Sequence, residues 1–92
     1  MKNNIKYNLI EIIIKIGEDK ALLDAFLIDL LTPAEYAEIN KRWKIIKMLD
    51  TGINQHKIAT NLHVGIATVT RGSRALQDSK GGFKKVIDLT KI

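Results

Sequence analysis

The chain has 92 residues and no cysteine, so it has neither a disulfide framework nor a thiolate metal site. Apolar runs such as Ile12 to Ile14 are far shorter than a membrane span and are bounded by charged residues. The N-terminus shows no apolar stretch followed by a small-residue cleavage site. These absences predict a cytoplasmic protein with no membrane partner.

Catalytic and metal-binding patterns are also missing. The two histidines, His56 and His63, have no carboxylate or thiolate partner at a spacing typical of a metal site. No pair of carboxylates is expected on one helix face beside a base. We therefore expect no enzymatic activity, no metal and no cofactor.

Apolar and basic residues are well represented. Hydrophobic residues make up 46% of the chain, which is typical of a globular protein. Fifteen Lys and Arg residues against 10 Asp and Glu give a net charge of +5, which suits a polyanionic partner. A chain of this length has little capacity for a second core, so a single domain over residues 1–92 is expected.

Apolar residues recur at helical spacing through most of the chain, and no strand pattern is seen, so the fold class is all-α. Four helices are predicted over residues 5–16, 20–30, 33–51 and 83–89, with two more between residues 55 and 76. Gly17 is expected to end the first helix. A polar, glycine-containing loop is expected over residues 77–82.

The third predicted helix carries the clearest local signal. Thr32 is expected to cap it, with Pro33 at the first helical position and Glu35 completing a capping box. Gly52 is expected to follow its last turn in a left-handed conformation. The inward positions are predicted to be Ile39, Trp43, Ile46 and Leu49; Tyr36, Lys41, Lys44 and Lys47 are expected mostly in solvent, and Arg42 partly covered beside Trp43.

The first two predicted helices are apolar on more than one face. Ile10 and Ile14, for example, lie off the main apolar stripe of the first helix. A monomer of this size has few elements to cover both faces, so we expect a homodimer. A membrane-surface helix is the alternative, but Glu11 and Lys15 give it only a narrow polar face.

Residues 55–76, QHKIATNLHVGIATVTRGSRAL, have the spacing of a helix-turn-helix motif, whose second helix lies in the major groove of DNA. A turn of three or four residues is expected around His63, and histidine tolerates positive φ better than most residues. The positions expected to face inward are Ile58, Ala59 and Leu62 on the first helix, Val64 in the turn, and Ile66, Val69 and Leu76 on the second helix.

The second helix of this motif has a polar outer face. Thr68, Thr70, Arg71 and Arg74 are expected to point away from the apolar stripe, and hydroxyl and cationic groups contact phosphates and base edges. Gly72 lies in the middle of the helix, where glycine costs about 1 kcal/mol relative to alanine. Such a glycine either marks a close approach by another backbone or a ligand, or is merely tolerated.

The sequence resembles the tryptophan repressor family. The resemblance is carried by Leu31-Thr32-Pro33 with Glu35, by Arg42, and above all by GIATVTRGS from Gly65 to Ser73, and it extends over about residues 30–83. It implies a six-helix chain that intertwines with a second copy as a homodimer. It also implies a transcriptional repressor of tryptophan biosynthesis or transport genes, with L-tryptophan as co-repressor.

The resemblance implies two sets of site residues. Arg42 and Arg71 would flank the indole, Thr32 and Arg71 would hold the carboxylate, and backbone carbonyls near Asp29 and Leu31 of the other subunit would accept the ammonium; Ile46 and Gly72 complete the co-repressor set. The DNA-binding set is Gln55, His56, Lys57, Gly65, Ile66, Ala67, Thr68, Thr70 and Arg74. The dimer would read a near-palindromic operator on double-stranded DNA, with half-sites about one helical turn apart.

Two departures from the family pattern lie in these segments. Ala75 stands where some members have a serine that reaches the ligand, and His63-Val64 replaces a glycine-containing turn. Two alternatives therefore stay open beside the tryptophan-dependent repressor. One is a helix-turn-helix regulator of the same fold that does not respond to tryptophan, and the other is a helical interaction module without a DNA target.

Overall fold

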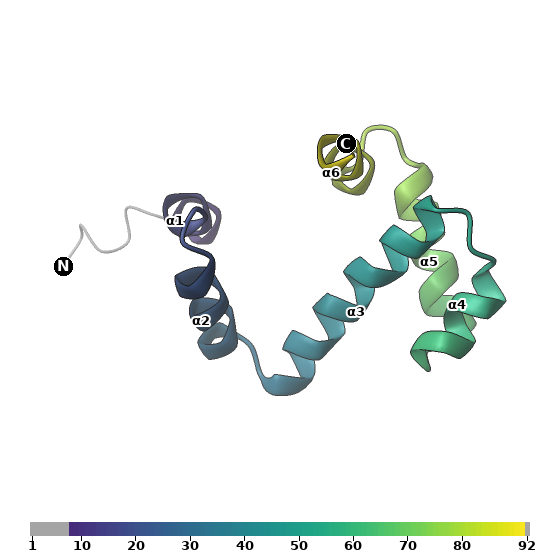
Figure 1. The fold of residues 1–92 in the computed structure, drawn as a ribbon, viewed down its shortest axis with the longest axis horizontal. Helices are drawn as coiled ribbons and strands as arrows, with labels where there is room; N and C mark the ends of the chain where they lie inside the picture. The colour runs from purple at the N-terminus through teal and green to yellow at the C-terminus, as the bar shows by residue number, and fades with distance from the viewer. Residues whose placement is uncertain (1–7, 92) are drawn as a thin grey trace. The chain divides into compact units, whose positions relative to one another are not determined.

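A computed structural model describes residues 8–91 of the chain (Figure 1). These residues form six α-helices and no strand, as the all-α prediction requires. The helices are α1 (Leu9–Ile16), α2 (Lys20–Leu30), α3 (Pro33–Asp50), α4 (Gln55–Leu62), α5 (Ile66–Gln77) and α6 (Gly82–Thr90). None of these helices is long and apolar enough to cross a membrane.

Short polar side chains determine where α1 and α3 begin. The Thr32 hydroxyl accepts a hydrogen bond from the Glu35 amide at 3.1 Å, and the Glu35 carboxylate accepts one from the Thr32 amide at 2.9 Å. This confirms the predicted capping box. Asn8 and Glu11 form the same reciprocal pair at the start of α1.

Most predicted helix ends lie within a residue or two of the observed ones. The start of the first helix is the exception, because α1 begins at Leu9 and its cap Asn8 is extended. The predicted start at Ile5 lies outside the described residues. Gly52 has φ +87° after α3, as predicted for a left-handed cap. The predicted loop over residues 77–82 is shorter, since α5 includes Gln77 and α6 begins at Gly82.

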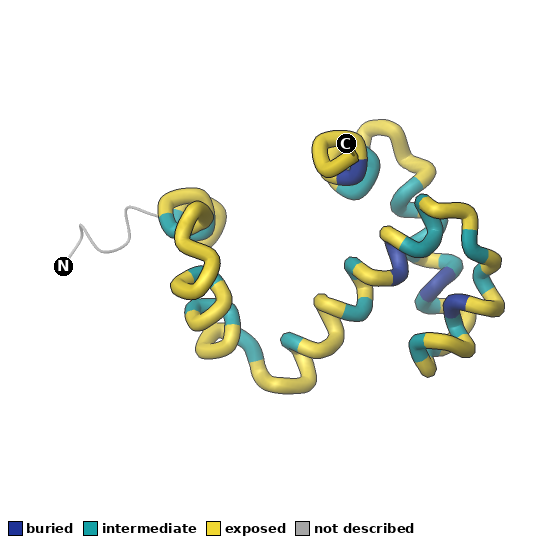
Figure 2. Tube along the Cα trace, viewed as in Figure 1, coloured by how far each residue is buried: buried dark blue, intermediate teal, exposed yellow. Residues whose placement is uncertain are grey.

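The structure divides into two compact units, Met1–Tyr36 and Ala37–Ile92. In the described part of the first unit, neither α1 nor α2 contains a buried residue (Figure 2). The Tyr36 hydroxyl donates a hydrogen bond to the Asp24 carboxylate and so joins the start of α3 to α2. The prediction that Tyr36 is mostly in solvent is therefore wrong, because this contact leaves it half-buried. Large apolar side chains are exposed in this unit at Leu9, Ile10, Ile14, Leu22, Ile28 and Leu30.

The second unit contains the core. The buried residues are Ile45 and Ile46 on α3, Ile58 on α4, Val69 on α5 and Ile87 on α6 (Figure 2). Partly buried side chains around Ile45, Ile58 and Val69 include Leu49, Leu62 and Val64, so the helix-turn-helix packs on the C-terminal half of α3.

Two predicted positions on α3 need correction. Ile45 is buried although it was not among the predicted inward positions, and Ile39 is 41% exposed although it was. The side chains of α3 that join the buried cluster begin at Ile45, six residues after Ile39, so Ile39 lies outside that cluster. A single apolar stripe cannot reveal where along a helix its partners begin.

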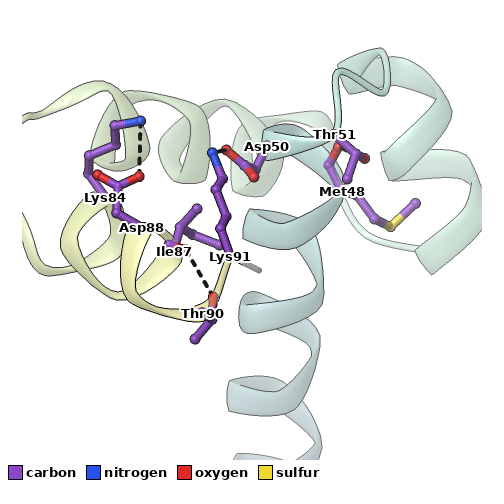
Figure 3. A network of polar contacts seen from close by, with 8 residues as sticks. All are labelled: Met48, Asp50, Thr51, Lys84, Ile87, Asp88, Thr90 and Lys91. Atoms are coloured by element: carbon purple, nitrogen blue, oxygen red, sulfur yellow. Dashed lines mark hydrogen bonds and ion pairs between the residues drawn. The ribbon is translucent and has the colours of Figure 1, made fainter.

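Helix α6 packs on the rest of the second unit through Ile87 and Phe83. The Phe83 ring lies 6.4 Å from the Trp43 ring between centroids, tilted by 39°. At the other end of α6, the Lys91 ammonium pairs with the Asp50 carboxylate at 3.4 Å and joins the ends of α6 and α3 (Figure 3). Val86 and Leu89, on the same helix, are 43% and 83% exposed.

The turn of the helix-turn-helix has three residues, His63 to Gly65. His63 has φ 55° and ψ 48°, the left-handed conformation that the sequence predicted for this position. The Val64 amide donates to the Ala59 carbonyl at 3.0 Å, which closes the end of α4. The turn length and the left-handed residue are thus both confirmed.

His63→Gly is expected to raise the free energy of unfolding by about 0.5–1 kcal/mol. The left-handed conformation costs an L-residue roughly 1–2 kcal/mol, part of which glycine loses again through the entropy of its unfolded chain. Urea unfolding of wild type, His63→Gly and His63→Ala would measure this. A glycine variant no more stable than wild type would contradict it.

Candidate functional site

A hollow of about 240 Å³ opens in the second unit between α3, α5 and the start of α6. Its floor is apolar and its rim carries charged side chains. The lining residues are Glu38, Arg42, Ile45, Ile46, Thr68, Arg71, Gly72, Ala75 and Phe83.

Gly72 is the residue that lets α5 approach α3 here. A Cβ atom at this position would lie 3.3 Å from Ile45 Cγ2, 3.4 Å from Ile46 Cδ1 and 3.7 Å from Leu49 Cδ1. Two of these contacts are at or below the close end of ordinary van der Waals packing, so a larger residue would push the helices apart or fill the hollow. Gly72 therefore costs about 1 kcal/mol of helix stability relative to alanine, but the close packing of α5 on α3 requires a residue without a side chain.

The charged rim consists of two guanidinium groups and one carboxylate. Arg42 Nε donates to Glu38 Oε2 at 2.9 Å, one helical turn away on α3. The two side chains are 56% and 49% exposed, so Arg42 is less covered than the sequence suggested. Arg71 is exposed on α5 at the edge of the same hollow. Guanidinium planes stack on aromatic rings and also pair with carboxylates.

Four of the residues predicted to bind a co-repressor come together in this hollow: Ile46, Arg42, Arg71 and Gly72. The other three, Asp29, Leu31 and Thr32, belong to the first unit. Asp29 and Leu31 are at the end of α2, where the last carbonyls of a helix lack intrahelical donors. The participation of these three residues remains a prediction.

Five members of the hollow were not in the predicted co-repressor set: Glu38, Ile45, Thr68, Ala75 and Phe83. Glu38 carries a signal that was available, since it precedes Arg42 by four residues and such pairs meet on one helix face. Phe83 lines the hollow from α6, a distant helix whose packing no local pattern reveals. The structure therefore adds a carboxylate and an aromatic wall to the predicted set.

A second hollow of about 170 Å³ adjoins the first. It shares Glu38, Arg42, Ile45 and Thr68 with the first hollow and extends to Lys41, Val64 and Gly65 at the turn of the helix-turn-helix. Lys41 is half-buried there, contrary to the expectation that it is mostly in solvent. Thr68 lines both hollows, so both reach the helix that is expected to read DNA.

The first turn of α5 carries several of the predicted DNA contacts. Gly65 precedes α5 without a side-chain cap, which leaves its first amides for an anion. Ile66 is 39% exposed, so its assignment to the inward stripe is wrong, and Ala67 is exposed beside it. The first turn of α5 lies outside the packed cluster, which explains the exposure of Ile66.

The hydrogen bonds of Thr70 and of the start of α4 differ from what the sequence predicted. The Thr70 hydroxyl is half-buried and donates to the Gln55 side-chain oxygen at 2.9 Å, so it joins α5 to α4 instead of pointing freely outward. The Asn54 side chain caps the amides of His56 and Lys57 at 2.8 and 3.3 Å. Phosphate contacts near these residues would therefore come mainly from side chains. Lys57 and Arg74 are exposed.

The fold and these hollows define a helix-turn-helix protein with a hollow of about 240 Å³ behind its second helix. The family model of the Trp repressor protein matches residues 6–91. The chain belongs to the Trp repressor family, whose members are transcription regulators and not enzymes.

Two relatives support this assignment. Each is named Trp operon repressor homolog, and they come from serovars L2 and L2b of Chlamydia trachomatis. Each is 36% identical to this chain over 74 residues, which is 79% of this chain and 78% of the relative. No solved structure matches the chain significantly.

Proposed function

We propose that this protein is a dimeric, DNA-binding repressor whose affinity for its operator rises when L-tryptophan binds in the hollow behind α5. Its targets would be genes of tryptophan biosynthesis or transport. The observation that carries the proposal is the lining of the hollow, in which Arg42 and Arg71 lie beside an apolar surface and Gly72.

The chemistry of the hollow suits an indole amino acid. Ile45, Ile46 and Phe83 offer an apolar surface for the ring, and the two guanidinium groups are suited to stack on it. Arg71 would also pair with the carboxylate, helped by Thr32. The ammonium would be accepted by carbonyls near Asp29 and Leu31 of the partner chain.

Binding in this hollow would be coupled to DNA binding through α5. Thr68, Arg71 and Gly72 line the hollow and belong to the same helix as the predicted base-reading residues. A ligand that fills the space between α3 and α5 favours one position of the reading helix, and any ligand that prefers the DNA-binding position raises DNA affinity. Ile66, Ala67 and Thr68 would then face base edges, with Lys57 and Arg74 on the phosphates.

The first unit supports the dimer in this proposal. Six large apolar side chains on α1 and α2 are about half exposed or more, from 48% at Leu9 to 72% at Ile14. Apolar surface of this extent is rarely left to water in a soluble protein. A second copy would cover it, and the dimer would present two reading helices to successive major grooves.

The test is DNA binding at fixed salt, with and without saturating L-tryptophan, on a site selected from random DNA in the presence of L-tryptophan. We expect L-tryptophan to tighten binding by about 5- to 150-fold, the usual range of allosteric coupling. Arg71→Ala should abolish this response. Arg74→Ala is the matched control, because loss of a phosphate contact should weaken binding equally in both conditions.

Two outcomes would favour one of the alternative functions over the proposed one. Wild-type affinity that is the same with and without L-tryptophan would favour a regulator of this fold that does not respond to tryptophan. A stable dimer that binds no DNA, or binds it without dependence on salt, would favour an interaction module.

A further inference from the structure

We infer that Thr70 contributes to DNA binding indirectly, by holding the Gln55 side chain so that its amide nitrogen donates to a DNA phosphate. The inference rests on the proposed DNA-binding function and deepens it by giving these two residues separate roles. Thr70 is then a positioning residue, and Gln55 makes the contact.

One hydrogen bond joins the two side chains across the helix-turn-helix. The Thr70 hydroxyl on α5 donates to Oε1 of Gln55, the first residue of α4, at 2.9 Å, and both residues are half-buried. The bond joins residues fifteen positions apart. Because Val69, the residue before Thr70, is fully buried, the backbone on the α5 side of this bond is held by the core.

The direction of this hydrogen bond decides which group is left for DNA. A threonine hydroxyl has one proton to donate, and phosphate oxygens act as acceptors. Because the proton of Thr70 is donated to Gln55, the hydroxyl has none to offer to a phosphate. The two N–H groups of the Gln55 amide have no acceptor among the described residues, so they are the donors that remain at this point.

The start of α4 is a suitable place for a phosphate contact. In a helix-turn-helix the first helix crosses the DNA backbone while the second enters the major groove. The Asn54 side chain already accepts from the amides of His56 and Lys57 at 2.8 and 3.3 Å, so these backbone groups are less available to a phosphate. A glutamine amide that Thr70 holds in one position loses less conformational freedom on binding, which strengthens the contact.

The test is a scan of the site selected from random DNA with single methylphosphonates, each of which removes the charge of one phosphate. Binding is measured at fixed salt with L-tryptophan present throughout, for wild type, Gln55→Ala, Thr70→Val and Thr70→Ser. Valine has nearly the shape of threonine but no hydroxyl, whereas serine keeps the hydroxyl. Thr60→Val is the control, because Thr60 is an exposed residue of α4. Urea unfolding reports any change in the stability of each variant.

We expect one phosphate of each half-site at which the methylphosphonate weakens wild-type binding more than it weakens binding of Gln55→Ala. Thr70→Val should show the same reduced sensitivity at that phosphate. It should also bind unmodified DNA about 3- to 10-fold more weakly, the effect of one hydrogen bond. Thr70→Ser and Thr60→Val should keep the wild-type pattern.

Three outcomes would overturn the inference. Reduced sensitivity of Thr70→Val at a different phosphate would show that Thr70 contacts DNA directly. A loss of affinity in Thr70→Val with unchanged sensitivity to every methylphosphonate would show that Thr70 only stabilises the fold. Both of these results would leave the proposed function in place, whereas a wild type that binds no DNA would overturn the proposed function and the role of Thr70 together.

Discussion

Ile58→Ala is expected to lower the free energy of unfolding by about 2–5 kcal/mol, the usual cost of truncating a buried isoleucine. Ile58 is fully buried and packs with Ile45 and Val69, so its side chain joins α4, α5 and α3. The loss would be a large fraction of the roughly 5–15 kcal/mol that stabilises a typical domain. The truncation would leave a cavity inside the helix-turn-helix, so DNA binding should be weakened too.

Urea unfolding followed by circular dichroism would measure this loss. Thr60→Ala is the matched control, since Thr60 is an exposed residue of the same helix and its truncation should change stability by less than about 0.5 kcal/mol. Similar unfolding midpoints for the two variants would show that the packing around Ile58 does not hold the helix-turn-helix together.

Gly72→Val is expected to reduce L-tryptophan affinity about 100-fold or more, a loss of about 2.7 kcal/mol of binding free energy. Its Cβ would lie 3.3–3.7 Å from side chains of Ile45, Ile46 and Leu49, and its methyl groups would fill part of the hollow. Overpacking at such a site also costs about 1–3 kcal/mol of stability.

Thermal melts with and without L-tryptophan separate these two effects. The melting temperature without ligand reports the packing cost, and its rise on adding L-tryptophan reports binding to the folded state. Gly82→Val is the control, because a Cβ at Gly82 meets no atom within 4 Å and Gly82 does not line the hollow. A ligand-induced rise in Gly72→Val equal to that of wild type would show that L-tryptophan binds elsewhere.

Local chemistry explains what the sequence predicted well. The capping box of Thr32 and Glu35, the left-handed Gly52 and the left-handed His63 depend on residues within one turn of each other. The periodicity of the helix-turn-helix also placed Ile58 and Val69 correctly among its inward positions, and both are fully buried. These features follow from steric and hydrogen-bonding preferences that the chain carries locally.

Contacts between distant helices explain what the sequence did not predict. Ile39 fits the apolar stripe of α3 but lies before the part that α4 and α5 cover. Thr70 looked like an outward polar residue, yet Gln55 on the preceding helix accepts its hydrogen bond. Phe83 enters the hollow because α6 packs beside Trp43, a contact between residues forty positions apart.

The residues predicted to bind a co-repressor also fall into two groups, those that the structure brings together and those that depend on contacts beyond one chain. Ile46, Arg42, Arg71 and Gly72 lie in one unit, and the structure brings them to one hollow. The assignment of Asp29, Leu31 and Thr32 depends on a partner chain, which no periodicity or capping pattern of a single chain specifies. Their part in the site rests on the resemblance to the family.

We propose that L-tryptophan and DNA bind to this protein with mutual reinforcement. Calorimetry would measure the Kd of L-tryptophan for the free protein and for the protein saturated with selected operator DNA. Coupling between two sites is reciprocal, so we predict that DNA tightens L-tryptophan binding by the same factor by which L-tryptophan tightens DNA binding, about 5- to 150-fold. The same Kd in both states, or no binding of L-tryptophan in either, would contradict the account.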